Sequence, residues 1–183
     1  MTKVYSVSRT IRPYIDLFEI SQIWLEIATN EEEGNLYNCI VSMVFCAFSL
    51  EAYLNHLGSI KLENWNSIER KICREGKLKK ICNLYNVSIN KRKTPYRYFD
   101  EILDFRDQIV HAKTEIFTDK TTKINLNKKR PELPEAKWEK MANSDRAGEF
   151  VKHTKEIIIS LHKLTGASNN PFGSPYSGSW SSE

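Results

Sequence analysis

The sequence NLYNCIVSMVFCAFSLEAYLNHLG, residues 35–58, carries no charge over its first sixteen positions. Its apolar residues recur every three or four positions, the spacing of one face of an α-helix. The stretch is slightly too short for a membrane span, and it contains Asn38, Ser42 and Ser49. We therefore expect a buried core helix that ends near Gly58, in a protein that does not cross a membrane.

A second long helix is expected immediately upstream. Residues 13–29 repeat apolar positions at helical spacing, and Pro13 suits a first helical turn. Only the polar stretch NEEEGN separates the two segments. Two long helices with so short a connector predict an antiparallel N-terminal hairpin.

The rest of the chain predicts further helices and no second domain. The expected elements are two short helices within 62–86 that divide near Gly76, a helix at 96–112, a loop or weak hairpin at 113–134, a short helix around Trp138 and a last helix from a Ser144 cap to about Leu164. The fold class is therefore all-α, a bundle of four to five helices in one domain, residues 1–165. Residues 166–183 are rich in Gly, Ser and Pro, and this tail is predicted to be disordered.

The positive charge is concentrated in the middle of the chain. The formal net charge is +4, yet residues 67–97 hold ten basic and two acidic residues. A concentrated basic stretch attracts phosphate even when the total charge is small. The candidate nucleic-acid-binding residues are Lys91, Arg92, Lys93 and Arg97, and the alternative interpretation is a solvated helix face followed by a loop.

The cysteines and histidines argue against several kinds of site. Cys39, Cys46, Cys73 and Cys82 form no C-x-x-C pair, and the N-terminal stretch MTKVYSVSRT has no apolar signal region. We therefore expect a cytoplasmic protein without a disulfide framework. The four histidines show neither H-x3-H nor H-E-x-x-H spacing, so no metal or other cofactor is expected.

Two charged residues interrupt apolar helix faces. Glu51 and Arg106 each fall where the periodicity calls for an apolar residue. Because a buried charge is costly unless it is paired, we expect the two to meet, or one of them to open onto a polar cleft. Asn55 lies four residues after Glu51 on the same face and can add a hydrogen bond. A buried ion pair that only fixes helix register is the alternative.

Next to Arg106, Asp107 and His111 are four residues apart and share a helix face. A carboxylate at this spacing can orient the imidazole, which suits proton transfer near neutral pH. Arg106 and His111 lie about 140° apart around the helix. They line one groove only if Arg106 reaches along the surface or a second copy completes the site.

Together these residues carry a resemblance. The stretch AFSLEAYLNHLG at 47–58, Trp65 with Ile68-Glu69-Arg70, and FRDQIVHAKT at 105–114 resemble the HEPN superfamily, in particular uncharacterised bacterial HEPN-like proteins. In that superfamily an R-x4–6-H motif lies in a helical bundle, and here Arg106, four residues and His111 match it. Glu51 matches the family's helix glutamate. The similarity covers about residues 35–115.

The resemblance implies a helical bundle that is commonly a homodimer. In the nuclease branch, two facing motifs cut RNA without a metal, with His111 in proton transfer and Arg106 stabilising the phosphate. Here Asp107 stands where the family often has Asn, and Ala112 where the closest relatives have Gly. The first hypothesis is therefore a non-catalytic module that binds RNA, a nucleotide or a protein partner, such as an antitoxin or a nucleotidyltransferase. The alternatives are a metal-independent endoribonuclease of toxin or defence type, acting through Arg106, Asp107 and His111, and an assembly protein.

Overall fold

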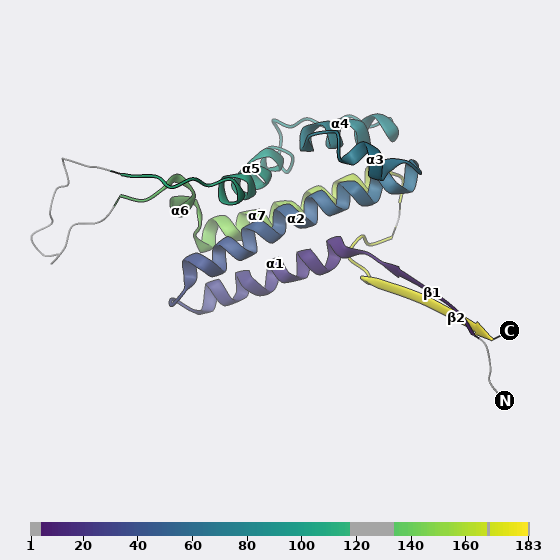
Figure 1. The fold of residues 1–183 in the computed structure, drawn as a ribbon, viewed down its shortest axis with the longest axis horizontal. Helices are drawn as coiled ribbons and strands as arrows, with labels where there is room; N and C mark the ends of the chain where they lie inside the picture. The colour runs from purple at the N-terminus through teal and green to yellow at the C-terminus, as the bar shows by residue number, and fades with distance from the viewer. Residues whose placement is uncertain (1–4, 118–133, 168, 183) are drawn as a thin grey trace, which may run out of the picture.

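The computed structural model describes residues 5–117, 134–167 and 169–182, and these are mostly helical with one small sheet (Figure 1). The elements in chain order are β1 (Tyr5–Ile11), α1 (Pro13–Asn30), α2 (Asn35–Lys61), α3 (Trp65–Glu69), α4 (Arg74–Leu84), α5 (Tyr98–Val110), α6 (Lys137–Met141), α7 (Ser144–Leu164) and β2 (Tyr176–Ser182). The all-α class is thus confirmed for the body of the protein.

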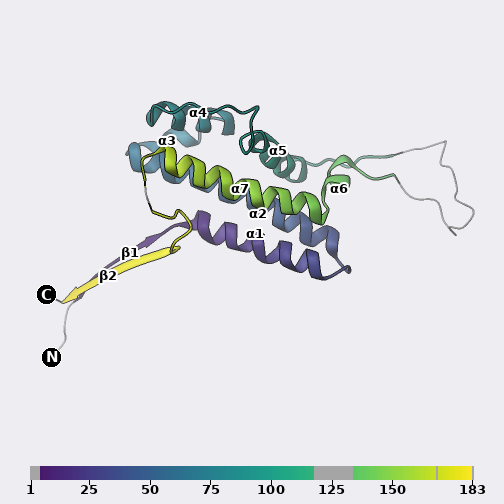
Figure 2. The same ribbon diagram turned by 180° about the vertical axis from the view of Figure 1, so that it is seen from behind.

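The core is built around α2. This helix contacts α1, α7, α5 and α4, and α1 and α2 lie side by side after a connector of four residues (Figures 1 and 2). Met43, Leu50 and Leu54 of α2 are fully buried. By length and composition alone α2 is apolar enough to cross a membrane, but half of that apolar window is buried inside the protein. Its contacts on several sides are those of a core helix.

Helix α2 does not end at Gly58 as predicted, but continues to Lys61. A glycine is needed there for a different reason, namely the close approach of the buried Trp65 ring. A Cβ at position 58 would lie 2.2 Å from ring atom Cε2 of Trp65. Gly58 therefore serves as the packing surface for the indole and does not stop the helix.

Two other predicted boundaries were wrong by a few residues. The break within 62–86 falls between Glu69 and Arg74, so Gly76 lies inside α4. The cap of the last helix is Asn143, whose Oδ1 accepts a hydrogen bond from the backbone N–H of Arg146 at 3.0 Å. Asn is as good a capping residue as Ser, and the sequence places both side by side. Most of the predicted loop 113–134 lies outside the described residues.

The tail differs most from its prediction. Residues 176–182, expected to be disordered, form β2, which pairs antiparallel with β1 from the other end of the chain. Arg12 N–H donates to the Pro175 carbonyl at 2.8 Å where the strands leave the bundle. Strands rich in serine and glycine have weak local preference, and this one forms by pairing with a segment about 170 residues away. Pairing at that sequence distance has no local signal.

Candidate functional site

The candidate catalytic residues all lie in the last turn and a half of α5 or at its end. Buried Phe99, Ile102, Leu103 and Phe105 fix this helix against α2 and α7. His111 is the C-terminal cap residue, and its backbone N–H donates to the Asp107 carbonyl at 2.9 Å. The packing of α5 thus sets where Arg106 and Asp107 point, while His111 lies exposed at the open end.

Arg106 and Glu51 meet, as the interrupted apolar faces predicted. Nη2 of Arg106 donates to Oε2 of Glu51 at 3.0 Å, and the other carboxylate oxygen accepts from Nζ of Lys77 at 2.8 Å. The Lys77 side chain is only 8% exposed, and Oε2 of Glu69 lies 4.0 Å from its Nζ. One carboxylate on α2 is therefore the shared partner of a cation on α4 and another on α5.

Asp107 belongs to the same network. Its carboxylate accepts a hydrogen bond from Nη1 of Arg74, and its Oδ1 lies 3.1 Å from Nε of Arg106. Nη2 of Arg74 binds Oδ1 of Asp104. Two arginines thus engage the Asp107 carboxylate, which was expected to orient the His111 ring.

Asn55 is close to this network in sequence but does not extend it. Its Oδ1 is buried and has no hydrogen-bond partner in the part of the chain that the structure describes. The additional hydrogen bond expected from Asn55 to the Glu51 network does not form among the described residues. Among the described residues, Lys77 and Arg106 hold the carboxylate of Glu51.

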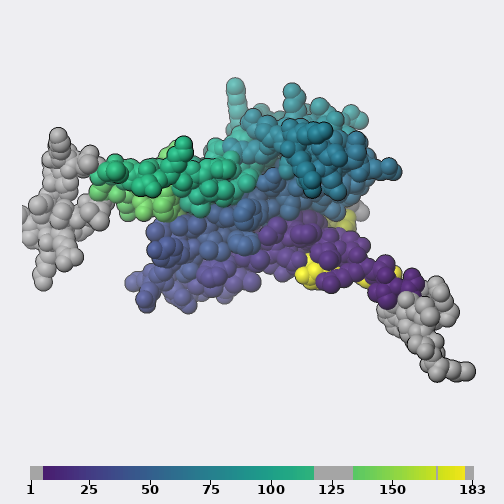
Figure 3. Space-filling model, in the orientation of Figure 1, coloured from purple at the N-terminus to yellow at the C-terminus, as the bar shows by residue number. Residues whose placement is uncertain are grey.

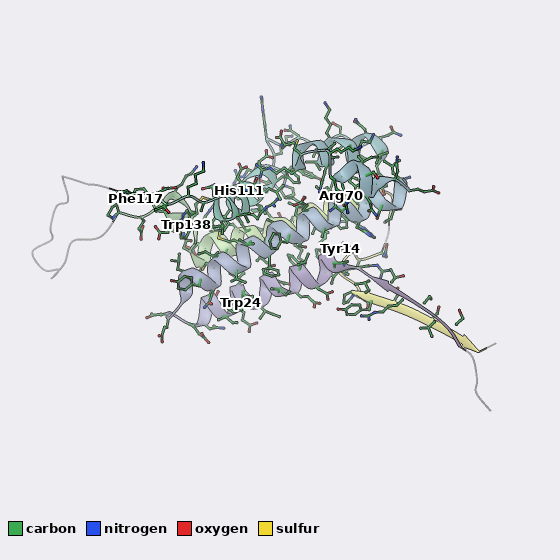
Figure 4. The ribbon with its side chains drawn as sticks, in the orientation of Figure 1. Tyr14, Trp24, Arg70, His111, Phe117 and Trp138 are labelled. Carbon is green, nitrogen blue, oxygen red and sulfur yellow. The ribbon has the colours of Figure 1, made fainter. Side chains whose placement is uncertain are left out.

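His111 lines a surface groove of about 650 Å³. The groove is bounded by the end of α5, the following segment, α6 and part of α4; its lining residues are Arg74, Asp104, Asp107, Gln108, His111, Ala112, Lys113, Glu115, Lys137 and Trp138. Figure 4 shows His111 and Trp138 at the same end of the protein, from different elements. We call this the His111 groove. It combines an imidazole, an indole and exposed lysines.

Arg106 does not line the His111 groove. Its guanidinium is held by Glu51, and its side chain is 20% exposed. Within one chain the predicted catalytic pair is therefore split, with the arginine in an internal network and the histidine on the surface. The angle of about 140° between the two positions on a helix already favoured this separation.

The predicted nucleic-acid-binding residues lie at the other end of α5. Lys91 is engaged by Glu75 at 3.0 Å and Asp100 at 2.7 Å, and Arg97 donates to the Tyr98 hydroxyl at 2.8 Å. Arg92 and Lys93 are exposed. Because α5 has 13 residues, its N-terminal cap Arg97 lies about 20 Å along the helix from His111 at the other end.

Sequence reasoning missed residues of both the network and the groove, among them Arg74, Lys77, Gln108, Lys113, Lys137 and Trp138. Lys77 had a usable signal, since it lies four residues before the buried Ile81 on the apolar side of α4, the same kind of interruption that identified Glu51. Trp138 had none, because its neighbours across the groove come from α5. No group of three or more His, Cys, Asp or Glu residues that suits a metal ion occurs among the described residues.

A separate polar cluster lies between the C-terminal parts of α2 and α7. The Tyr53 hydroxyl and His162 Nδ1 are 2.9 Å apart, and His162 Nε2 lies 3.1 Å from Oδ1 of Asn169. Burial, with smaller contributions from Arg12 and His162, lowers the pKa of His56, and burial raises the pKa of Tyr53. These groups face the core and the C-terminal segment, and we assign them a structural role.

Comparison of the chain with protein-family models, with curated proteins and with solved structures finds no match.

Proposed function

We propose that the protein is a HEPN-like module that binds single-stranded RNA in the His111 groove and does not cleave it. The observation that carries the proposal is the separation of Arg106 from His111, in a groove that carries Trp138 and two exposed lysines beside the acidic Asp104, Asp107 and Glu115. The HEPN assignment rests on the sequence resemblance over residues 35–115. A protein partner such as an antitoxin or a nucleotidyltransferase remains a prediction from the same resemblance, and a cytoplasmic location remains a prediction from the cysteine pattern and the N-terminal stretch.

The groove offers the two kinds of contact that single-stranded nucleic acid needs. Trp138 is half-buried and provides a flat ring on which a base can stack. Lys113 and Lys137 are exposed on the groove wall and can neutralise phosphates. His111 and Gln108 add donors and acceptors near the base.

The same groove is poorly suited to cleavage by one chain. Cleavage requires a fixed cation close to the proton-transfer group, because negative charge develops on the phosphate in the transition state. Arg106 is committed to Glu51, and Arg74, the nearest groove arginine, is neutralised by Asp104 and Asp107. Binding without chemistry is therefore the function that the arrangement supports best.

The test is fluorescence anisotropy with a short labelled single-stranded RNA in the presence of a chelator, followed by gel analysis of the RNA. We expect binding that weakens about 7- to 20-fold between 50 and 200 mM salt, as for two or three phosphate contacts on a single strand, with the RNA intact. The double substitution Lys113→Glu/Lys137→Glu should abolish binding.

The matched control is Lys152→Glu/Lys155→Glu, which changes the same charge on exposed positions of α7. It should bind as the wild type does, apart from the general loss of positive charge. Equal loss of binding in both double variants would contradict a site in the His111 groove. Binding that does not respond to salt would contradict phosphate recognition.

The second candidate is a metal-independent endoribonuclease assembled across a homodimer. It is favoured by the exposure of His111 together with Val110, which is 57% exposed at the open end of α5. A second α5 docked there would bring a further Arg106 and His111 to the site. Chelator-resistant RNA cleavage that is lost in His111→Ala but kept in His153→Ala would establish this function in place of the first.

A further inference from the structure

The terminal strands form a two-stranded ribbon that stands apart from the helical bundle. In the space-filling view the purple and yellow atoms of β1 and β2 project from the body (Figure 3). Within residues 5–117, 134–167 and 169–182 no third strand pairs with either one. A lone two-stranded ribbon is marginally stable in water, and an unpaired strand edge is a template for another strand.

The two faces of the ribbon differ in chemistry. Ser8 pairs with Ser179, and their hydroxyl oxygens are 2.8 Å apart, so one face carries hydroxyl groups. On the other face Ile11 pairs with Tyr176, and Val7 is 75% exposed. Apolar groups this exposed on a thin ribbon are typical of a surface that meets a partner.

The sequence of β2 is symmetric about its glycine. Residues 176–180 read Tyr-Ser-Gly-Ser-Trp, an aromatic residue, a serine, Gly178, a serine and an aromatic residue. The whole strand, Tyr176–Ser182, contains no charged residue and no proline. Native edge strands are usually protected by charges or proline, so this edge lacks the ordinary protection.

We propose that β2 is a homodimerisation strand, which pairs antiparallel with β2 of a second copy about a two-fold axis at Gly178. In that register Gly178 faces the partner's Gly178, and Ser177 faces the partner's Ser179. Residue 176 then lies opposite residue 180 of the partner, and the symmetry creates this register pair twice. The product is a four-stranded sheet in the order β1, β2, partner β2, partner β1.

A second copy suits this edge because a two-fold interface must be self-complementary. Cross-strand serine pairs stabilise an antiparallel sheet, and the symmetry about Gly178 supplies two pairs of Ser177 with the partner's Ser179. The nearest charge on the ribbon, Arg9, lies on the outer strand β1. Two copies therefore bring no like charges into direct opposition.

This dimer is independent of the proposed RNA function. The ribbon and the His111 groove lie toward opposite ends of the molecule (Figures 1 and 4). Pairing through β2 leaves both His111 grooves open, and it does not bring one His111 toward the other. Loss of the dimer should therefore leave RNA binding by each chain in place.

The test is the molar mass in solution, measured by light scattering on a sizing column. The wild type should have twice the chain mass. Ser177→Lys/Ser179→Lys places like charges opposite each other across the axis and should be monomeric. Ser177→Lys/Ser179→Glu places opposite charges there and should remain dimeric, although it alters the same two positions. A monomeric wild type, or two double variants of equal mass, would overturn the proposal.

A cross-linking experiment checks the register. In a Cys73→Ser background, which removes the exposed native thiol, Ser177→Cys/Ser179→Cys should form disulfide-linked dimers under mild oxidation. Either single substitution should not, because each cysteine would face a partner serine. Equal cross-linking of the single and double variants would show that the strands do not pair about Gly178.

Discussion

The Glu51 carboxylate holds the Arg106 guanidinium, with Nη2 donating to Oε2 at 3.0 Å. This contact joins α2 to α5 and keeps Arg106 out of the groove that His111 lines. Lys77 occupies the second carboxylate oxygen. Glu51, which matches the helix glutamate of the HEPN family, therefore has a structural role in this chain as the shared partner of two cations.

Removal of Glu51 should destabilise the fold. Glu51→Ala leaves Lys77, which is 6% exposed, without its closest carboxylate, and it also frees Arg106. Loss of the partner of a buried charge costs about 1–3 kcal/mol, which denaturant unfolding measures as a lower midpoint at constant slope. The control Glu63→Gln changes an exposed glutamate and should unfold like the wild type. An unchanged midpoint for Glu51→Ala would refute the role of the network.

Substitution of Gly58 should disturb the contact between α2 and α3. In Gly58→Ala the new methyl group would meet the Trp65 ring at 2.2 Å, and such overpacking costs about 1–3 kcal/mol. Gly148 is the matched control, because it also lies within a helix and a Cβ there meets nothing within 4 Å. Gly148→Ala should raise the free energy of unfolding by about 0.5–1 kcal/mol. Thermal unfolding should therefore show a lower midpoint for Gly58→Ala and a higher midpoint for Gly148→Ala.

The stability should depend on pH through His56. Burial first, and Arg12 and His162 next, lower the pKa of His56 below its ordinary value of 6.5. The folded state therefore binds fewer protons than the unfolded state, so this contribution is fully present above pH 6.5 and is lost as the pH falls. His56→Gln should reduce the decline in unfolding free energy between about pH 7.5 and about pH 5. The same decline in both proteins would assign it to other groups.

The native protein should have one reactive thiol. Cys73 is exposed, whereas Cys39, Cys46 and Cys82 are buried, and burial raises the pKa of Cys46 to about 12. A thiol reagent should therefore modify one cysteine per chain before denaturation and all four afterwards. Cys73→Ser should remove the native reaction, and rapid modification of a second thiol would show that the core opens.

Trp138 should contribute to RNA affinity. Loss of one stacked base costs about 1–3 kcal/mol, so Trp138→Ala should weaken binding between about fivefold and 150-fold. Trp138→Phe keeps an aromatic face and should retain most of the affinity. Trp24, which is half-buried on α1, provides the control Trp24→Phe, with wild-type binding expected. Full affinity in Trp138→Ala would place the RNA elsewhere.

The parts of the fold that were predictable from the sequence are those set by local periodicity. The spacing in residues 13–29 and 35–58 predicted α1 and α2, and the two interrupted faces predicted that Glu51 and Arg106 would meet. The prediction that α2 ends near Gly58 was wrong, because this glycine serves a tertiary contact with Trp65 and the helix continues past it. The position of Trp138 beside His111 depends on how the segment after α5 returns, which no local pattern encodes.

The pairing of β1 with β2 has a consequence for biosynthesis. Ser8 cannot pair with Ser179 until Ser179 has been synthesised, 171 residues later. At the usual rates of translation that interval lasts on the order of ten seconds or more. During this time the helices can form on the ribosome while β1 lacks its partner strand, so the ribbon closes late, after the helices.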